Sequence, residues 1–157
     1  MPTATRPADT RIAEQLFGLL PRLGQLWSDA VRDTSGGSVV RMKVLGMLSR
    51  NGPTRSGELA VFCGTTPSNM TELIEGLVDD GLARRDDDPT DRRAVLIAIS
   101  RAGQAEVDRV VAAATVNFMK LYDGLTPERR ARLRTAVNDL SEILATPSAS
   151  KESRNVR

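Results

Sequence analysis

Apolar residues recur at helical spacing over most of the chain and divide it into successive amphipathic segments. The first segment covers 12–30, and Pro21 inside it predicts a kink or a division into two helices. A polar break that contains two glycines follows at 33–38, and a second helical pattern then covers 40–48. The pattern therefore predicts a helical N-terminal third.

Two short helical segments joined by a glycine turn come next. Thr54 is expected to cap a helix whose body covers 57–63 and which ends at Gly64. Thr66 then caps a further helix that begins at Pro67, because a proline is well tolerated where the helix N–H has no partner. Two helices joined by a short turn containing glycine form a helix-turn-helix.

A charged hairpin is predicted directly after these helices. Two short runs with strand character, 82–85 and 94–99, enclose the acidic and basic loop 86–93. Asp88-Pro89 is a favourable start for a type I turn within that loop. A hairpin that projects from a helix-turn-helix and carries charge at its tip is a wing.

Two long helices complete the pattern. Ser100 is expected to cap a helix that runs to about Tyr122, and the sequence Thr126-Pro127-Glu128 is typical of the start of another. The predicted fold is therefore mainly α: a winged helix-turn-helix with a two-stranded antiparallel wing and long terminal helices.

Composition excludes several classes of function but does not identify one. The chain has 157 residues, of which 40% are hydrophobic and 27% charged, as in an ordinary globular domain. Cys63 is the only cysteine, and neither a leader nor a membrane-spanning run is expected, so the sequence predicts a cytoplasmic protein. There is no histidine, no metal-binding set and no phosphate-binding glycine loop, so neither an enzyme nor a cofactor is predicted.

The distribution of charge leaves two interpretations open. Residues 40–65 carry four basic side chains and one acidic one, whereas residues 66–100 carry four basic and eight acidic ones. The predicted helix-turn-helix and wing therefore do not form one broad basic patch. A winged helix that binds another protein, without specific DNA binding, is the alternative to a DNA-binding protein.

The predicted wing carries the most specific motif of the chain. Residues 81–100 read GLARRDDDPTDRRAVLIAIS, in which Asp91 and Arg93 are followed after five residues by Ile99-Ser100. This segment resembles the wing of the multiple-antibiotic-resistance regulator (MarR) family, whose motif is Asp-x-Arg and then Leu-Thr.

The similarity extends beyond the wing to 56–60 and 66–71 and covers about 10–145. It implies a transcriptional regulator, usually a repressor, that binds a pseudo-palindromic operator in double-stranded DNA as a homodimer. It also implies that a small aromatic or acidic effector releases the DNA.

The same similarity implies that residues 1–157 form a single domain. An N-terminal dimerisation helix at 10–33 and C-terminal dimerisation helices at 101–146 flank the DNA-binding lobe at 38–100. The segments 1–8 and 147–157 are polar and lack periodicity, so flexible tails are expected there.

Residues expected to contact DNA lie at the start of the second helix of the helix-turn-helix and on the wing. Asn69 carries a donor and an acceptor and therefore suits adenine. Glu72 stands where many relatives have arginine, and the alternatives for its carboxylate are to accept from a cytosine amine or to stay away from the DNA backbone. The whole expected set is Thr66, Ser68, Asn69, Thr71, Glu72, Arg84, Arg85, Arg92 and Arg93.

Two wing arginines are alternatives for insertion into the minor groove. Asp91 and Arg93 are two residues apart, hence on one face of a strand, and an ion pair between them is expected to stiffen the wing. Arg92 points to the other face. The pattern leaves open whether Arg92 or Arg93 enters the groove.

The effector site is expected near the aromatic residues of the long helices. Its expected residues are Phe17, Trp27, Arg41, Phe118 and Tyr122. The alternative is that these aromatic side chains are ordinary core. Cys63 is interpreted as a packed apolar residue rather than a redox switch.

Overall fold

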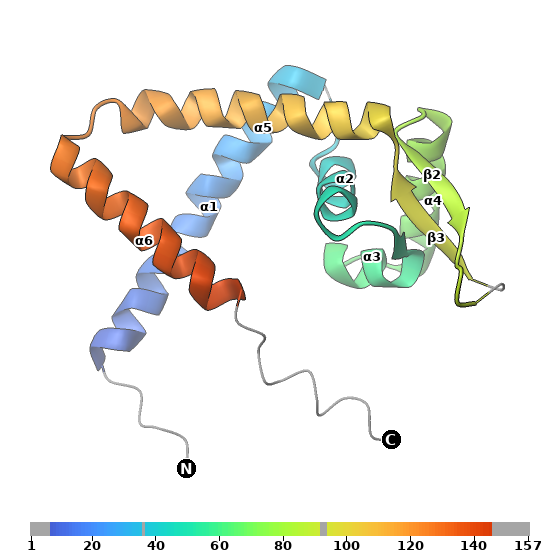
Figure 1. Cartoon of the computed structure of the whole chain (residues 1–157), viewed down its shortest axis with the longest axis horizontal. Coiled ribbons are helices and arrows are strands. Elements are labelled where there is room, and N and C mark those ends of the chain that lie inside the picture. The colour runs from blue at the N-terminus through green and yellow to red at the C-terminus, as the bar shows by residue number, and fades with distance from the viewer. Residues whose placement is uncertain (1–6, 36, 92–93, 146–157) are drawn as a thin grey trace, which may run out of the picture. The chain divides into compact units, whose positions relative to one another are not determined.

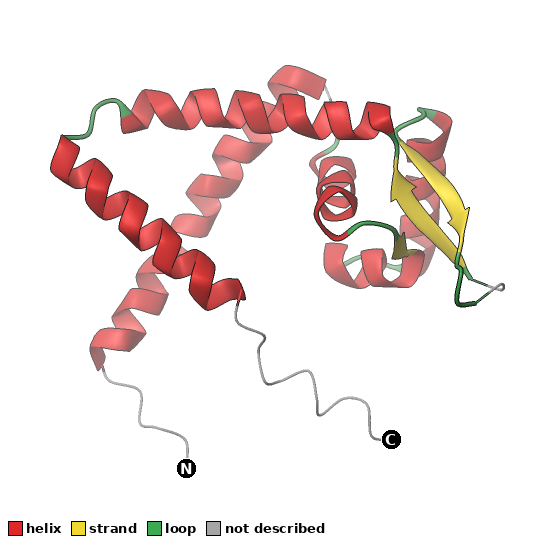
Figure 2. Cartoon of the chain, in the orientation of Figure 1, coloured by secondary structure: helices red, strands yellow, loops and turns green. Residues whose placement is uncertain are grey.

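The computed structural model describes residues 7–35, 37–91 and 94–145, which form six helices and three strands (Figures 1 and 2). The elements are α1 (Pro7–Ser35), α2 (Val39–Asn51), β1 (Thr54–Arg55), α3 (Ser56–Cys63), α4 (Pro67–Asp79), β2 (Ala83–Asp87), β3 (Val95–Ile99), α5 (Arg101–Tyr122) and α6 (Pro127–Ala145). The mainly helical winged fold is confirmed. The chain divides into two compact units, residues 1–118 and 119–157.

Helix ends in the first unit follow the local sequence. The hydroxyl of Thr66 accepts a hydrogen bond from the Asn69 N–H at 3.2 Å, so Thr66 caps α4 as predicted. Gly64 ends α3 with a φ of 67°, a left-handed conformation that favours glycine. Pro21 lies inside α1 and does not divide that helix, so of the two predicted alternatives, a kink or a division, the division is excluded.

The wing contains the predicted hairpin and one strand more. β2 and β3 are antiparallel, and the short β1 pairs with the other edge of β3. Thr54 was expected to cap α3, and this prediction is wrong. Thr54 lies in β1 opposite Ile97, where it is buried, and Arg55 occupies the N-cap position of α3 without a side-chain capping bond.

One hydrophobic core joins α2, α3, α4 and the sheet. On α4 the buried face carries Met70, Ile74 and Leu77, three residues with helical spacing, which leaves the opposite face to solvent. The largest fully buried side chains are Leu45, Leu48, Leu59, Met70, Ile74, Leu77, Val31, Val44 and Val110. The core therefore fixes α4 against the base of the hairpin.

The first helix contributes to this core only near its C-terminal end, through Ala30 and Val31. Closer to its N-terminus, an apolar stripe remains between 36% and 59% exposed and consists of Ile12, Leu16, Leu19, Leu20 and Leu23. An exposed stripe of this length is typical of a helix that packs against another protein chain.

The second unit contains the end of α5 and the whole of α6. The guanidinium of Arg130 lies 5.1 Å from the ring centre of Tyr122 and donates hydrogen bonds to the carbonyls of Asp123 and Leu125. Thr126 accepts from the Arg129 N–H at 3.4 Å and thereby caps α6, as predicted. No helix in the described part of the chain has the length and apolar character needed to span a membrane.

Candidate functional site

The exposed face of α4 presents polar side chains at the start of the helix. Ser68, Asn69, Thr71 and Glu72 are all exposed, on the side of α4 away from the core. Thr71 donates its hydroxyl proton to the Pro67 carbonyl at 3.0 Å, which holds its side chain against the first turn. The four residues form one surface, which has the position and the functional groups needed to meet base edges in a major groove.

Arg85 of β2 lies beside this surface, whereas Arg84 points to the opposite face of the sheet, and each faces a carboxylate. Arg84 donates to Asp86 at 2.9 Å, and a nitrogen of Arg85 lies 3.9 Å from a carboxylate oxygen of Glu75 on α4. Both arginines remain about half exposed, so these pairs are weak in water and can exchange for phosphate oxygens. Arg92 and Arg93, and with them the expected Asp91–Arg93 pair, lie outside the described residues.

A hollow of about 270 Å³ separates α4 from the wing. Its polar wall is formed by Ser56 at the start of α3, Thr71 and Arg85, and its remaining wall by Ile74, Val95 and Ile97. Ser56 was not among the residues expected to contact DNA, since a lone serine at the start of a helix forms no functional pattern. The structure brings it together with Thr71 of α4 and Arg85 of β2.

A second contact that the sequence did not reveal joins Arg55 to Asp88. The Asp88 carboxylate accepts from Nε and Nη2 of Arg55 at 3.1 and 2.6 Å, although 33 positions separate the two residues. Hydrogen bonds from Thr90 and from Arg55 hold the pKa of Asp88 well below its usual range. The carboxylate is therefore ionised at neutral pH.

Comparison with known proteins places this geometry in a family. Residues 38–95, which span α2 to the start of β3, match the MarR family. The transcriptional regulator YcgE of Bacillus subtilis is 26% identical over 134 residues, which cover 85% of this chain and 87% of YcgE. The transcriptional repressor IacR of Pseudomonas putida is 26% identical over 69% of this chain and 65% of its own length.

Solved structures agree with the described architecture. The transcriptional regulator Tm0710 of Thermotoga maritima superposes with a TM-score of 0.73 at 25% identity, over 86% of this chain and 94% of Tm0710. The MarR-family regulator Sco3205 of Streptomyces coelicolor, crystallised in complex with DNA, gives a TM-score of 0.57 at 20% identity and 94% coverage of both chains. Over residues 38–95, the chain is a winged helix-turn-helix of the MarR family. It is a DNA-binding transcriptional regulator and not an enzyme.

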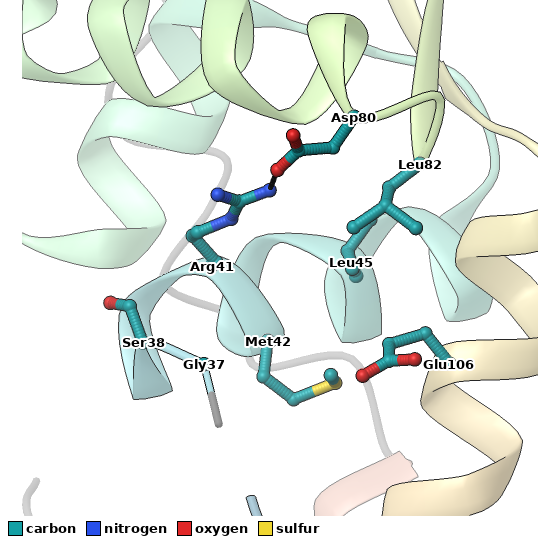
Figure 3. A pocket seen from close by; sticks show the side chains of 8 residues that line it. All are labelled: Gly37, Ser38, Arg41, Met42, Leu45, Asp80, Leu82 and Glu106. Atoms are coloured by element: carbon teal, nitrogen blue, oxygen red, sulfur yellow. Dashed lines mark hydrogen bonds and ion pairs between the residues drawn. The ribbon is translucent and has the colours of Figure 1, made fainter. Parts of the chain in front are cut away.

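A larger hollow of about 560 Å³ lies in the first unit of this MarR-family protein (Figure 3). Its wall consists of Gly37, Ser38, Arg41, Met42, Leu45, Asp80, Leu82 and Glu106. Arg41 forms an ion pair with Asp80, the C-cap residue of α4, and donates to the Gly76 carbonyl at 3.3 Å. The guanidinium therefore connects the wall of the hollow to the C-terminal end of α4.

Of the residues expected around an effector, Arg41 is on the wall of this hollow. Phe17 is exposed on α1, and Trp27 packs at the edge of the core. Phe118 is exposed near the end of the first unit, and Tyr122 stacks on Arg130 in the second unit. The apolar wall of the hollow is formed instead by aliphatic and thioether side chains.

Cys63 lies half-buried at the end of α3 and packs against the core. Burial raises the pKa of its thiol, and the nearby charge of Lys43 opposes this effect only in part. Packing of this kind agrees with the interpretation of Cys63 as a structural residue. Among the described residues, no cluster of three or more side chains suited to a metal ion is found.

Proposed function

We propose that this regulator binds a pseudo-palindromic operator in double-stranded DNA as a homodimer, represses transcription in the cytoplasm and is released by a small organic effector. The observation that carries the proposal is the polar surface of α4 placed directly beside an arginine-bearing wing. The repressor name of IacR and the DNA complex of Sco3205 support it by similarity.

In this proposal α4 enters the major groove and reads base edges. Asn69 donates to and accepts from adenine, while Ser68 and Thr71 bond to bases or phosphates. Glu72 accepts from a cytosine amine. Thr66 contributes through its cap, which holds the first turn of α4 in place.

The wing and the hollow beside it take the sugar–phosphate strand. Arg84 and Arg85 exchange their carboxylate partners for phosphate oxygens, and either Arg92 or Arg93 enters the adjacent minor groove. Glu75 competes with phosphate for Arg85, so binding is expected to weaken strongly as salt rises.

Asn69→Ala is expected to weaken operator binding by about 1–3 kcal/mol and to relax the preference at one base pair. Arg85→Ala should instead weaken binding to every sequence and reduce the slope of log affinity against log salt by roughly one. Operators selected from random duplexes, followed by fluorescence anisotropy at several salt concentrations, measure both effects.

Asn138→Ala, which removes an exposed asparagine from α6, serves as the control and should bind like wild type. Equal affinity of the wild-type protein for all duplexes would instead favour the winged helix that binds another protein.

The exposed apolar stripe of α1 supports dimerisation through 10–33 and 101–146. Further exposed apolar side chains lie along α5 and α6, and these are Val111, Val116, Phe118, Met119, Leu121, Val137, Ile143 and Leu144. Apolar surface of this extent is normally covered by a partner chain. A two-fold dimer would place its two α4 helices in successive major grooves, about 34–36 Å apart.

The hollow at Arg41 supports an effector that carries a carboxylate or phenol. Such a ligand would compete with Asp80 for the guanidinium and so remove Arg41 from the end of α4. A positive charge at a helix C-terminus stabilises that helix, so its loss would favour another position of α4. A ligand that binds this altered state more tightly shifts the dimer away from DNA.

Aromatic carboxylates and phenols are therefore expected to release the operator and to change the fluorescence of Trp27, the only tryptophan. Arg41→Gln should weaken the response to carboxylates by at least about tenfold, because the charged hydrogen bond is lost. Arg50→Gln on the same helix is the matched control, and Cys63→Ser should respond like wild type. The proposal fails if no organic compound acts while peroxide releases DNA and Cys63→Ser abolishes that release.

A further inference from the structure

Asp88 is a buried carboxylate in the turn of the wing, with an exposed fraction of 6%. Its Oδ2 accepts from Nε and Nη2 of Arg55, and its Oδ1 accepts from the backbone N–H and the hydroxyl of Thr90 at 2.8 and 2.6 Å. Four donors thus converge on one side chain. A buried carboxylate is tolerated only with such compensation.

This contact joins the start of α3 to the turn of the wing. Arg55 is the last residue of β1 and the N-cap residue of α3, while Asp88 directly follows β2. The backbone pairing of β1 with β3 involves only two residues of β1, opposite Ile97 and Leu96. The Arg55–Asp88 pair is therefore a side-chain tie between the helix-turn-helix and the turn of the wing.

Register explains why the two side chains meet. Arg55 and Asp86 both lie opposite Leu96, so their side chains are on the same face of the sheet. Strand alternation then brings Asp88, two residues after Asp86, to that face as well. The tie depends on β1, a strand that the sequence pattern does not predict.

We propose that Asp88 is a positioning residue for DNA binding, which holds the wing at a fixed orientation relative to α3 and α4. The inference rests on the proposed operator binding. A hairpin of two five-residue strands is too small to be rigid by itself. Without the tie, binding would have to order the wing, and the entropy lost would lower the affinity.

Asp88→Asn tests this directly, because asparagine keeps the shape of the side chain. Its oxygen can still accept from Thr90, but its amide group faces the guanidinium of Arg55 with donors only. Affinity for the full operator should fall on the order of tenfold. Hydroxyl-radical footprints should lose protection where the wing lies and keep it along α4.

A duplex shortened to remove the segments under the wings supplies an internal comparison. Wild type and Asp88→Asn should bind this duplex equally, because neither can use its wing there. Asp87→Asn is the matched control, because it removes an exposed carboxylate from the neighbouring position of the same hairpin. Its affinity and footprint should remain those of wild type.

Arg55→Lys provides a second variant in case Asp88→Asn melts well below wild type. Lysine keeps the charge but lacks the paired nitrogens that bind one oxygen of Asp88, so the wing footprint should again be lost. If a folded variant kept the wing footprint and the affinity of wild type, the proposed role of Asp88 would be overturned, while the proposed operator binding would stand. If the wild-type protein itself gave no wing footprint, the proposed DNA contacts of the wing would be overturned. The proposed role of the Arg55–Asp88 tie would be overturned with them.

Discussion

The double substitution Leu20→Glu, Leu23→Glu is expected to separate the dimer into monomers and to reduce operator affinity at least about hundredfold. Both side chains belong to the apolar stripe of α1, and both are more than half exposed in the single chain. In a dimer interface the two carboxylates would be buried without partners, which costs several kcal/mol. The monomers would then bind half-sites separately, without the factor of about 10²–10⁴ gained from joining two binding units.

Sedimentation velocity at low micromolar concentration and anisotropy with full operators and half-sites measure the two effects. Gly18→Glu is the control, since it adds a carboxylate to an exposed position on the opposite face of α1, where a Cβ meets no atom within 4 Å. The double variant should keep the melting behaviour of the winged lobe, because its substitutions lie far along α1 from Ala30 and Val31. A wild-type protein that is monomeric under these conditions, yet binds full operators tightly, would contradict the proposed dimer.

Local sequence was sufficient to predict where α4 begins and which of its faces is buried. Its cap at Thr66, its proline at the first position and its apolar spacing all act within a few residues. The same holds for the cap of α5, where Ser100 accepts from the Gly103 N–H at 3.0 Å. These predictions were right because short-range geometry decides them.

The third strand could not be predicted in this way. β1 contains two residues, too few for any alternation of apolar and polar positions, and it forms because β3 offers a free edge. Thr54 therefore looked like a helix cap, although its side chain is buried in the sheet. The Arg55–Asp88 tie depends on that strand and was hidden for the same reason.

The expected effector residues show that residue type alone does not predict which side chains line a hollow. They were chosen by residue type, as aromatic side chains on long helices, whereas the larger hollow arises where Met42 and Leu45 of α2 meet Leu82, which lies between α4 and β2. Only packing in three dimensions determines such convergence. Arg41 was selected because of its charge, and its position on the wall agrees with the chemistry that the selection assumed.

Gly103→Ala is expected to destabilise the first unit by on the order of 3 kcal/mol or more, since overpacking against backbone is costly. A Cβ at this position would lie 2.0 Å from the Leu82 carbonyl oxygen and 2.9 Å from Cγ1 of Ile99. The carbonyl cannot move away freely, because it accepts from the Ser100 N–H at 3.0 Å. The start of α5 and the base of the wing therefore meet at a contact that only glycine permits.

Urea unfolding followed by circular dichroism measures this effect, with Gly57→Ala as the control. A Cβ on Gly57 meets no atom within 4 Å, so alanine in that helix should be neutral or stabilising by up to about 1 kcal/mol. Gly103→Ala should unfold at a clearly lower urea concentration, and operator affinity should fall with it because the wing loses its support. If both alanine variants unfolded with the wild-type midpoint, α5 would not approach Leu82 as closely as the structure has it.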